Sequence, residues 1–215
     1  MDWAAWHEAY DDPSSPLSAR LRSVQAHLSD AISQAPAGPI RLVSLCAGQG
    51  RDVIGVLPSH PRREDVRAVL VEADPRNAGV ARSAAAALDL AQVEVREADA
   101  SLVAGFADAL PAGVLLLCGI FGNVSDSDIR RTVQAAPALC HRGATAIWTR
   151  NRRPPDLTPQ IREWFTAAGF DEIAFDAVET TALTSVGVAR LGRDPDRVLP
   201  DGPLFTFGSA RAARR

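Results

Sequence analysis

The chain alternates short apolar runs with stretches of helical periodicity, and this alternation restricts its fold more than any other feature. Runs of strand character cover residues 41–45, 67–71, 92–96, 114–118 and 144–149, and two more, 172–175 and 185–191, close the series with no helix between them. Runs that are apolar throughout suit strands buried on both faces. The pattern therefore predicts a doubly wound α/β fold whose parallel sheet carries one antiparallel strand near its edge.

Helical stretches separate these runs and carry the usual terminal signals. They are expected at residues 50–57, 75–88, 101–109, 125–139 and 158–168. Pro75 is compatible with a first helical turn, Ser125 and Asp128 form a capping box, and Gly169 suits a helix end. Residues 202–207 are expected to form a last strand or a strap.

The first 35 residues precede the sheet and are predicted to form a helical extension. Apolar side chains recur at helical spacing over residues 17–32, which predicts an ordered helix packed on the rest of the chain. The remaining residues, 36–215, are predicted to form a single domain. The sequence leaves open whether the protein is a monomer or a homodimer.

Composition excludes several kinds of chemistry. All 23 Lys and Arg residues are arginine, so the chain has no P-loop lysine and no lysine for a Schiff base. The three cysteines are widely spaced, which predicts neither a disulfide framework nor a metal site and favours a cytoplasmic protein. A net charge of −3 argues against a nucleic-acid partner, and no apolar run reaches membrane-spanning length.

A glycine-containing turn, Ala47-Gly48-Gln49-Gly50, follows the first strand and opens a helix. Such a turn lets the backbone approach a ligand, and the helix N-terminus favours a carboxylate or a phosphate. Glu72, at the end of the second run, is placed to accept both hydroxyls of a ribose, unless it is only a surface carboxylate near Arg76. Asp99, after the third run, suits either an adenine amine or a helix cap. Together these residues predict an adenosine-containing cofactor.

This order of strand, turn and two acids resembles the class I S-adenosylmethionine-dependent methyltransferases, from about residue 41 to residue 191. The segments SLCAGQGRD, WTR and WHEAYDDPSSPLSARL resemble bacterial members of that superfamily. The resemblance implies a seven-stranded sheet of order 3-2-1-4-5-7-6 with the last strand antiparallel. It also implies S-adenosylmethionine as cofactor, S-adenosylhomocysteine as product, and methyl transfer to oxygen or nitrogen of a small molecule. The residues then expected at the cofactor are Arg20, Ser44, Cys46, Ala47, Gly48, Gly50, Arg51, Asp52, Glu72, Ala73, Asp99, Ala100, Cys118 and Gly119.

The first turn departs from the acid-x-Gly-x-Gly-x-Gly pattern of that superfamily. Ser44 replaces the acid that helps to hold the methionine amino group, and Cys46 replaces the first glycine. The turn is expected to survive if Cys46 has a negative φ, and a packed apolar thiol is favoured over a reactive one. Arg51 or Asp52 is expected to reorganise the methionine end. A dinucleotide fits less well, because Asp52 would face its pyrophosphate.

Candidates for the methyl acceptor come from the extension and from the loops after the fourth and fifth strands. His7 is the first choice for a general base, with interfacial packing as the alternative, and Tyr10 is a second catalytic candidate. Asn123 is placed either to orient an acceptor or to serve the turn before Ser125. The expected substrate-binding residues, for a small molecule that is anionic, are Phe121, Arg150 and Arg152.

Two other functions stay open at this point. The missing acid and the lack of a definite base are compatible with a catalytically silent module that binds S-adenosylmethionine or another nucleoside. An acceptor space filled by protein side chains would favour that alternative. A nicotinamide oxidoreductase is the third option.

Overall fold

The computed structural model describes residues 8–178, 182–196 and 198–207, and its centre is one seven-stranded sheet. The strands follow the order β3-β2-β1-β4-β5-β7-β6, and β7 runs antiparallel to β5 and β6. This confirms the predicted α/β class, strand order and antiparallel strand. The strands are β1 (Ile40–Leu45), β2 (Val66–Glu72), β3 (Val93–Glu97), β4 (Ala112–Leu117), β5 (Cys140–Asn151), β6 (Phe170–Ala177) and β7 (Thr184–Leu191).

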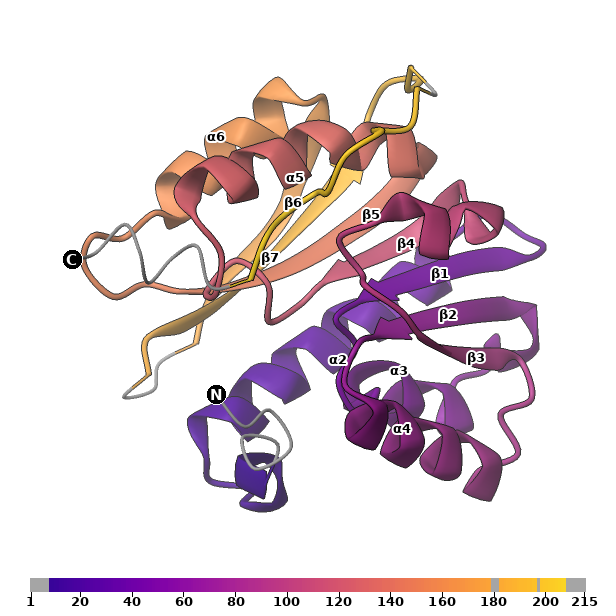
Figure 1. Ribbon diagram of the computed structural model, residues 1–215. Coiled ribbons are helices and arrows are strands. Elements are labelled where there is room, and N and C mark those ends of the chain that lie inside the picture. Colours follow the sequence, from indigo (N-terminus) through magenta and orange to yellow (C-terminus); the bar gives the residue numbers. More distant parts are fainter. Residues whose placement is uncertain (1–7, 179–181, 197, 208–215) are drawn as a thin grey trace.

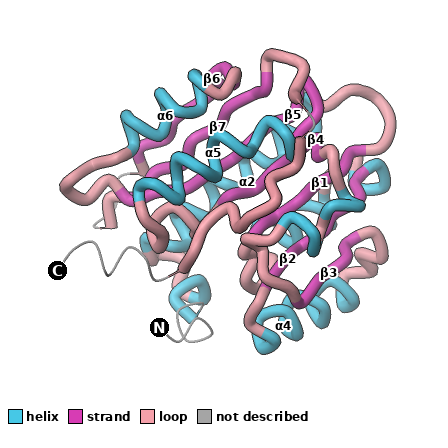
Figure 2. The backbone as a smooth tube through the Cα atoms, turned by 45° about the horizontal axis from the view of Figure 1, so that its top comes forward, coloured by secondary structure: helices cyan, strands magenta, loops and turns pink. Residues whose placement is uncertain are grey.

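Helices cover both faces of the sheet, as the apolar central strands require. Figures 1 and 2 show α5 and α6 over one face and α2, α3 and α4 over the other. The bounds are α2 (Pro16–Gln34), α3 (Arg51–Val56), α4 (Pro75–Ala87), α5 (Asp126–Leu139) and α6 (Thr158–Ala167), and a 3₁₀ turn, η1 (Glu8–Asp11), precedes them. Further 3₁₀ turns are η2 (Leu57–Ser59), η3 (Arg63–Asp65), η4 (Val103–Gly105) and η5 (Ala107–Ala109).

One sequence prediction needs correction here, and the structure decides between the two alternatives of another. The helix expected at residues 101–109 is replaced by the 3₁₀ turns η4 and η5, because Gly105 disfavours a continuous helix and Phe106 is drawn fully into the core. Residues 202–207 form no strand. They form a strap, in which the Leu204 N–H donates to the Ser101 carbonyl at 2.8 Å.

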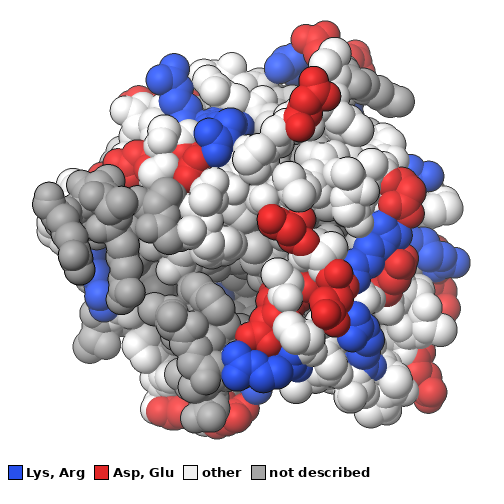
Figure 3. Space-filling view, viewed as in Figure 1, with Lys and Arg blue, Asp and Glu red and all other residues white. Residues whose placement is uncertain are grey.

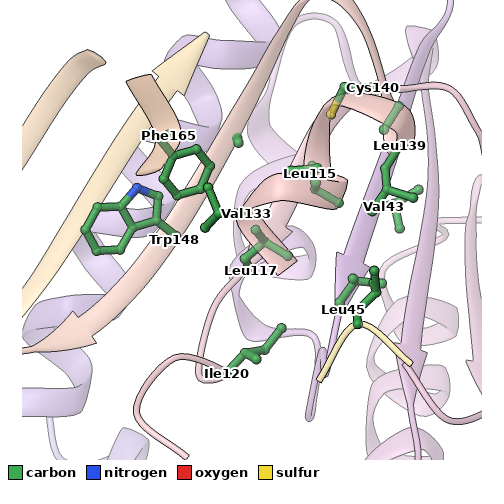
Figure 4. Close-up of a cluster of buried hydrophobic side chains, with 14 of the residues drawn as sticks. Val43, Leu45, Leu115, Leu117, Ile120, Val133, Leu139, Cys140, Trp148 and Phe165 are labelled. Atoms are coloured by element: carbon green, nitrogen blue, oxygen red, sulfur yellow. The ribbon is translucent and has the colours of Figure 1, made fainter. Parts of the chain in front are cut away.

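The alternating side chains of the strands divide the apolar core into two layers. Leu42, on β1, faces α2 and α3, whereas its neighbour Val43 faces α5 and α6. Figure 4 shows the second layer, where Trp148 stacks on Phe165 with ring centroids 5.9 Å apart. A Cβ atom at Gly187 would lie 2.1 Å from the Trp148 ring, so this glycine is needed for the stack.

The N-terminal helix α2 is an integral part of the first core layer. Ser15 caps it by accepting a hydrogen bond from the Ser18 N–H at 3.1 Å, and Leu28 has no exposed surface. On its other side, Ser23 and His27 both contact the Asp176 carboxylate of β6, at 2.7 and 2.8 Å. These contacts fix the helix against the sheet.

On the face drawn in Figure 3, acidic and basic side chains are interspersed, and neither charge dominates the surface. In the part of the chain that the structure describes, no helix is long and apolar enough to cross a membrane. Within those same residues, no three His, Cys, Asp or Glu side chains come together as metal ligands.

Candidate functional site

The turn between β1 and α3 lies where the strand order reverses, between β1 and β4. In open α/β sheets, ligands bind outside the carboxyl ends of the strands at such a point. Gly48 and Gly50 both have positive φ, and a Cβ atom on Gly50 would lie 2.9 Å from the side chains of Ile54 and Leu70. This packing explains why a glycine opens the helix.

Cys46 also has a positive φ, of 55°, so the turn forms without the negative φ on which its survival was expected to depend. Cys46 therefore has a left-handed backbone conformation although it is not a glycine. This conformation costs a non-glycine residue about 1 kcal/mol. The Ala47 N–H compensates by donating to the Val71 carbonyl at 3.0 Å, which ties the turn to the end of β2. Burial raises the pKa of the Cys46 thiol, as expected for a packed thiol.

Glu72 is held in one position by two backbone donors. Its Oε2 accepts from the Gly48 N–H at 2.7 Å, and its Oε1 accepts from the Asp74 N–H at 2.8 Å. Arg76 pairs with Asp74, at 2.8 Å, whereas the Glu72 carboxylate is bound by the two backbone N–H groups. Each carboxylate oxygen keeps a second lone pair, because an ionised carboxylate accepts about four hydrogen bonds.

A cavity of about 230 Å³, which we call the Glu72 cavity, opens beside this carboxylate. It joins the turn after β1 to the residues that follow β2, β3 and β4, as the sequence predicts for one ligand edge. Asp99 lines it and accepts from the Ser101 N–H at 2.9 Å, a turn contact rather than a helix cap, because η4 begins at Val103 without a side-chain cap. The described residues that line it are Cys46, Gly48, Glu72, Ala73, Asp74, Asn77, Asp99, Ala100, Gly119 and Phe207.

A smaller cavity of about 70 Å³, the Asp52 cavity, adjoins it at Cys46 and Gly119. Helix α2 forms its outer wall. Its described lining consists of Tyr10, Arg20, Leu21, Val24, Cys46, Ala47, Gln49, Arg51, Asp52, Cys118 and Gly119. The Arg20 guanidinium donates to the Tyr10 hydroxyl at 2.5 Å, and Arg51 pairs with Asp11 at 2.8 Å.

Charges of opposite sign face this small cavity from two elements. Asp52, on α3, is 8% exposed, and burial raises the pKa of its carboxyl to about 6, although the Arg20 charge on α2 acts in the opposite direction. Burial also raises the pKa of the Tyr10 phenol and of the Cys118 thiol. At neutral pH the described lining of the cavity therefore presents the Asp52 carboxylate, the guanidinium groups of Arg20 and Arg51, and the protonated Tyr10 phenol, and Arg51 is paired with Asp11.

A third cavity of about 280 Å³, the Arg150 cavity, lies beyond Arg20 and Gly119. Its described lining is Arg20, Gly119, Gly122, Asn123, Thr149, Arg150, Asn151, Arg153, Ala182 and Thr184. Three of these residues are arginines, and the described lining contains no carboxylate and no aromatic ring. The buried Arg150 guanidinium donates to the Phe121 carbonyl, which holds it against the loop after β4.

Gly119 is the point at which the three cavities meet. It lines all of them, has a φ of +77°, and donates its N–H to the Thr149 Oγ1 at 2.9 Å. A Cβ atom there would meet nothing within 4 Å, so the glycine leaves open space at the junction. One ligand can thus span the Glu72 and Asp52 cavities while a second molecule approaches from the Arg150 cavity.

Several predicted site residues lie away from the cavities. The Ser44 side chain is buried within β1, and Gly50 serves the turn with its backbone, so neither lines a cavity. Phe121 is expected to wall the substrate site, but its ring is fully buried and packs on Trp148 with centroids 6.0 Å apart. Arg152 is replaced in the lining by Arg153. His7 lies outside the described residues.

Sequence reasoning also missed residues that the fold brings to the site. Asn77 and Phe207 line the Glu72 cavity, and Gln49 lines the Asp52 cavity. Thr184, whose buried Oγ1 has no hydrogen-bond partner among the described residues, lines the Arg150 cavity. Asn77 falls on the inner face of a helix that starts at the ligand edge, which is a usable signal. No sequence signal indicated Phe207, because it lies 16 residues after the last strand and outside every motif.

Comparison with known proteins identifies the fold. No protein-family model matches the chain, and no curated protein matches it in sequence. Among solved structures, magnesium protoporphyrin IX methyltransferase from Synechocystis PCC 6803 with bound S-adenosylmethionine is similar at a TM-score of 0.70 and 11% identity, over 88% of this chain and 91% of that one. The chain therefore has the fold of the class I S-adenosylmethionine-dependent methyltransferases.

Two further structures share this fold. The Burkholderia thailandensis 1,6-didemethyltoxoflavin-N1-methyltransferase, with bound 1,6-didemethyltoxoflavin and S-adenosylhomocysteine, matches at a TM-score of 0.64 and 16% identity, over 89% of this chain and 87% of that one. An O-methyltransferase family protein from the same organism matches at 0.62 and 18% identity, over 88% of this chain and 59% of that one. At such identities the likeness establishes the fold, and function must be argued from the site.

Proposed function

We propose that this protein is an S-adenosylmethionine-dependent methyltransferase that acts on a small polar, anionic molecule and releases S-adenosylhomocysteine. The observation that carries the proposal is the pairing of two adjoining cavities at the switch point. One has acidic acceptors for a nucleoside, and the other has opposite charges for an amino acid. A sulfonium nucleoside with a zwitterionic tail needs both in this arrangement.

The nucleoside end of the cofactor fits the Glu72 cavity. Glu72, locked by the Gly48 and Asp74 N–H groups, directs its remaining lone pairs at the ribose hydroxyls. Asp99 accepts from the exocyclic amine of the base. Because these acceptors are already oriented in the ligand-free protein, little ordering entropy is lost on binding.

The amino-acid end fits the Asp52 cavity. Asp52 serves as the counter-ion for the methionine ammonium group and takes over from the carboxylate that Ser44 lacks. Arg20, oriented by the Tyr10 hydroxyl, binds the methionine carboxylate. Asp52 is buried and Arg20 is half-buried, so their interactions with a bound zwitterion are less screened by solvent than those of exposed charges.

The acceptor fits the Arg150 cavity, which meets the cofactor space at Gly119. Arg150 and Arg153 bind an anionic group of the substrate, and Asn123 orients it, since the Asn123 amide nitrogen is fixed by the Gly119 carbonyl at 2.7 Å. S-adenosylmethionine supplies an electrophilic methyl group on its sulfonium. The protein's contribution is alignment of the acceptor atom and exclusion of water.

The titratable groups that the structure describes at the site, which do not include His7, favour an acceptor that is already deprotonated at neutral pH. Tyr10 lines the Asp52 cavity rather than the acceptor cavity, and its raised pKa keeps the phenol protonated, which makes it a positioning group for Arg20. A carboxylate or a deprotonated nitrogen or oxygen needs no general base. The open acceptor cavity also weighs against a catalytically silent module, whose acceptor space would be filled.

Calorimetric titration tests the proposal. S-adenosylhomocysteine and S-adenosylmethionine are expected to bind with one site per chain, and 5′-methylthioadenosine, which lacks the amino-acid end, is expected to bind more weakly. NADH is the control ligand, because the nicotinamide alternative requires it to bind. Absence of binding by both S-adenosyl compounds at millimolar concentration refutes the proposal.

A further inference from the structure

The chain ends, within its described part, in a strap that crosses the molecule beside α5. The strap comprises residues 201–207, and Figure 1 draws it in yellow in front of the sheet. Leu204 and Phe205 are each 1% exposed, so they anchor the strap in the core. The Leu204 carbonyl accepts from the Thr132 Oγ1 of α5 at 2.9 Å, and its N–H donates to the Ser101 carbonyl at 2.8 Å.

This anchoring carries the strap to the Glu72 cavity. Ser101 directly follows Asp99 and Ala100, which line that cavity, so the hydrogen bond from Leu204 joins the strap to the cavity wall itself. Phe207, at the end of the described strap, lines the Glu72 cavity. Its ring meets Phe205 edge to face, with centroids 5.5 Å apart, and it remains 43% exposed.

An aromatic ring that is partly exposed at a cavity mouth has surface available to cover an apolar ligand face. The two acids of the cavity fix how a nucleoside would lie. Glu72, after β2, takes the ribose, and Asp99, after β3, takes the exocyclic amine, so the base lies on the side of Asp99 and Ala100, next to the Ser101 carbonyl to which the strap is hydrogen-bonded. Every nucleobase offers a π-face to such a ring.

We propose that Phe207 is the stacking partner of the adenine base, and that the C-terminal strap completes the cofactor site. This inference rests on the proposed function, because it assigns a base to the Glu72 cavity. It adds a specificity-determining residue from a segment that is remote in sequence from the strand ends that form the rest of the site.

Substitution of Phe207 tests the inference by calorimetry with S-adenosylhomocysteine and 5′-methylthioadenosine. Loss of a base–aromatic stack costs about 1–3 kcal/mol, so Phe207→Ala is expected to weaken both ligands by the same factor, roughly 5- to 150-fold. Phe207→Trp and Phe207→Tyr are expected to restore affinity, and Phe207→Leu is not. The matched control is Val198→Ala, an exposed apolar residue before the strap that lines none of the three cavities.

The outcomes separate this inference from the proposed function. If the wild-type protein binds both ligands and Phe207→Ala binds them equally well, the stacking assignment is overturned and the proposed function stands. Tighter binding by Phe207→Ala also overturns it, because the ring would then be obstructing the cavity. If Phe207→Leu binds both ligands with wild-type affinity, the aromatic role of this residue is overturned. Failure of the wild-type protein to bind either ligand overturns both proposals. Thermal unfolding without ligand is expected to be nearly unchanged, since the ring is half exposed.

Discussion

The substitution Asp52→Asn is expected to make the protein more stable and its cofactor affinity lower. The Asp52 carboxyl is buried, and its pKa of about 6 in the folded protein lies above the value of about 3.9 in an unfolded chain. Above pH 6 the carboxyl is ionised in both states, so the folded state carries a desolvation cost of up to about 3 kcal/mol. An asparagine keeps the shape and accepts the same Val53 N–H bond, which Asp52 accepts at 2.8 Å, without that charge.

Ligand binding is expected to change in the opposite direction. A buried charge-assisted hydrogen bond contributes about 1.5–3 kcal/mol, so Asp52→Asn is expected to weaken S-adenosylhomocysteine roughly 10- to 150-fold. 5′-Methylthioadenosine has no ammonium group, and its affinity is expected to remain within about twofold of wild type. The control is Asp30→Asn, which changes an exposed carboxylate of α2 and is expected to alter neither ligand.

The pH dependence gives an independent readout of the same group. The described charged or titratable side chains that line the cavity with Asp52 are Arg20 from α2, Arg51 beside it, Tyr10 from the 3₁₀ turn, and the thiols of Cys46 and Cys118. Burial raises the pKa of the phenol and of both thiols, which therefore stay protonated from pH 5 to 7.5, whereas the Asp52 carboxyl changes its charge in this range. If binding requires its ionised form, wild-type affinity for S-adenosylhomocysteine falls about tenfold from pH 7.5 to pH 5, and that of Asp52→Asn stays flat.

The difference in unfolding free energy between Asp52→Asn and the wild-type protein also depends on pH. The advantage of Asp52→Asn over wild type is greatest above pH 6, because wild-type Asp52 is then charged in the folded state. It shrinks as the pH falls from 6 towards 4, because the carboxyl of the folded protein becomes protonated, and it disappears only below pH 4, where the carboxyl of the unfolded chain is protonated as well. Urea unfolding at pH 4.5 and 7.5 measures it. Asp52→Asn that binds S-adenosylhomocysteine as tightly as wild type, or a wild-type affinity that is independent of pH, refutes the reasoning.

Three further predictions concern other parts of the site and its supports. Glu72→Ala is expected to weaken S-adenosylhomocysteine and 5′-methylthioadenosine by the same factor, about 1–3 kcal/mol in titration calorimetry, because both contain the ribose; unequal losses would argue against the ribose contact. Burial raises the pKa of the Cys46 and Cys118 thiols and keeps them protonated, so mass spectrometry is expected to find both alkylated by iodoacetamide at pH 7.5 much more slowly in the native protein than in urea; native labelling as rapid as in urea would contradict the raised pKa. Ser125→Ala removes the cap of α5, where the Ser125 Oγ accepts from the Asp128 N–H at 3.1 Å, and is expected to cost about 1 kcal/mol in urea unfolding with unchanged ligand affinity; a change in affinity would place this cap within the site.

Local sequence patterns were sufficient for the order of the elements and for the acids of the nucleoside side. Glu72 and Asp99 stand directly after strands, and parallel strands bring their carboxyl ends to one edge of a sheet, so their proximity follows from the alternation of elements alone. The cap at Ser125 is equally local, because its donor and acceptor lie three residues apart. Such features depend on backbone periodicity and short-range hydrogen bonds, which the sequence encodes directly.

Conformations and protonation states that depend on distant neighbours were beyond the sequence. Cys46 adopts a positive φ while the end of β2 holds the adjacent N–H, so the turn forms without the negative φ that the sequence argument made its condition. Phe121 was expected at the substrate, but Trp148 and the rest of the core take its ring. A local motif does not indicate whether an apolar side chain in a loop packs into the core or lines the site.

The sequence by itself therefore determined the α/β alternation, the glycine-containing turn and the acids at the strand ends. Only the tertiary structure placed α2 against α3, which buries Asp52 opposite Arg20, and only it brought Phe207 to the wall that contains Asp99. The physical reason is that burial, and with it the pKa of a carboxyl or the exposure of a ring, depends on surfaces supplied by residues far along the chain.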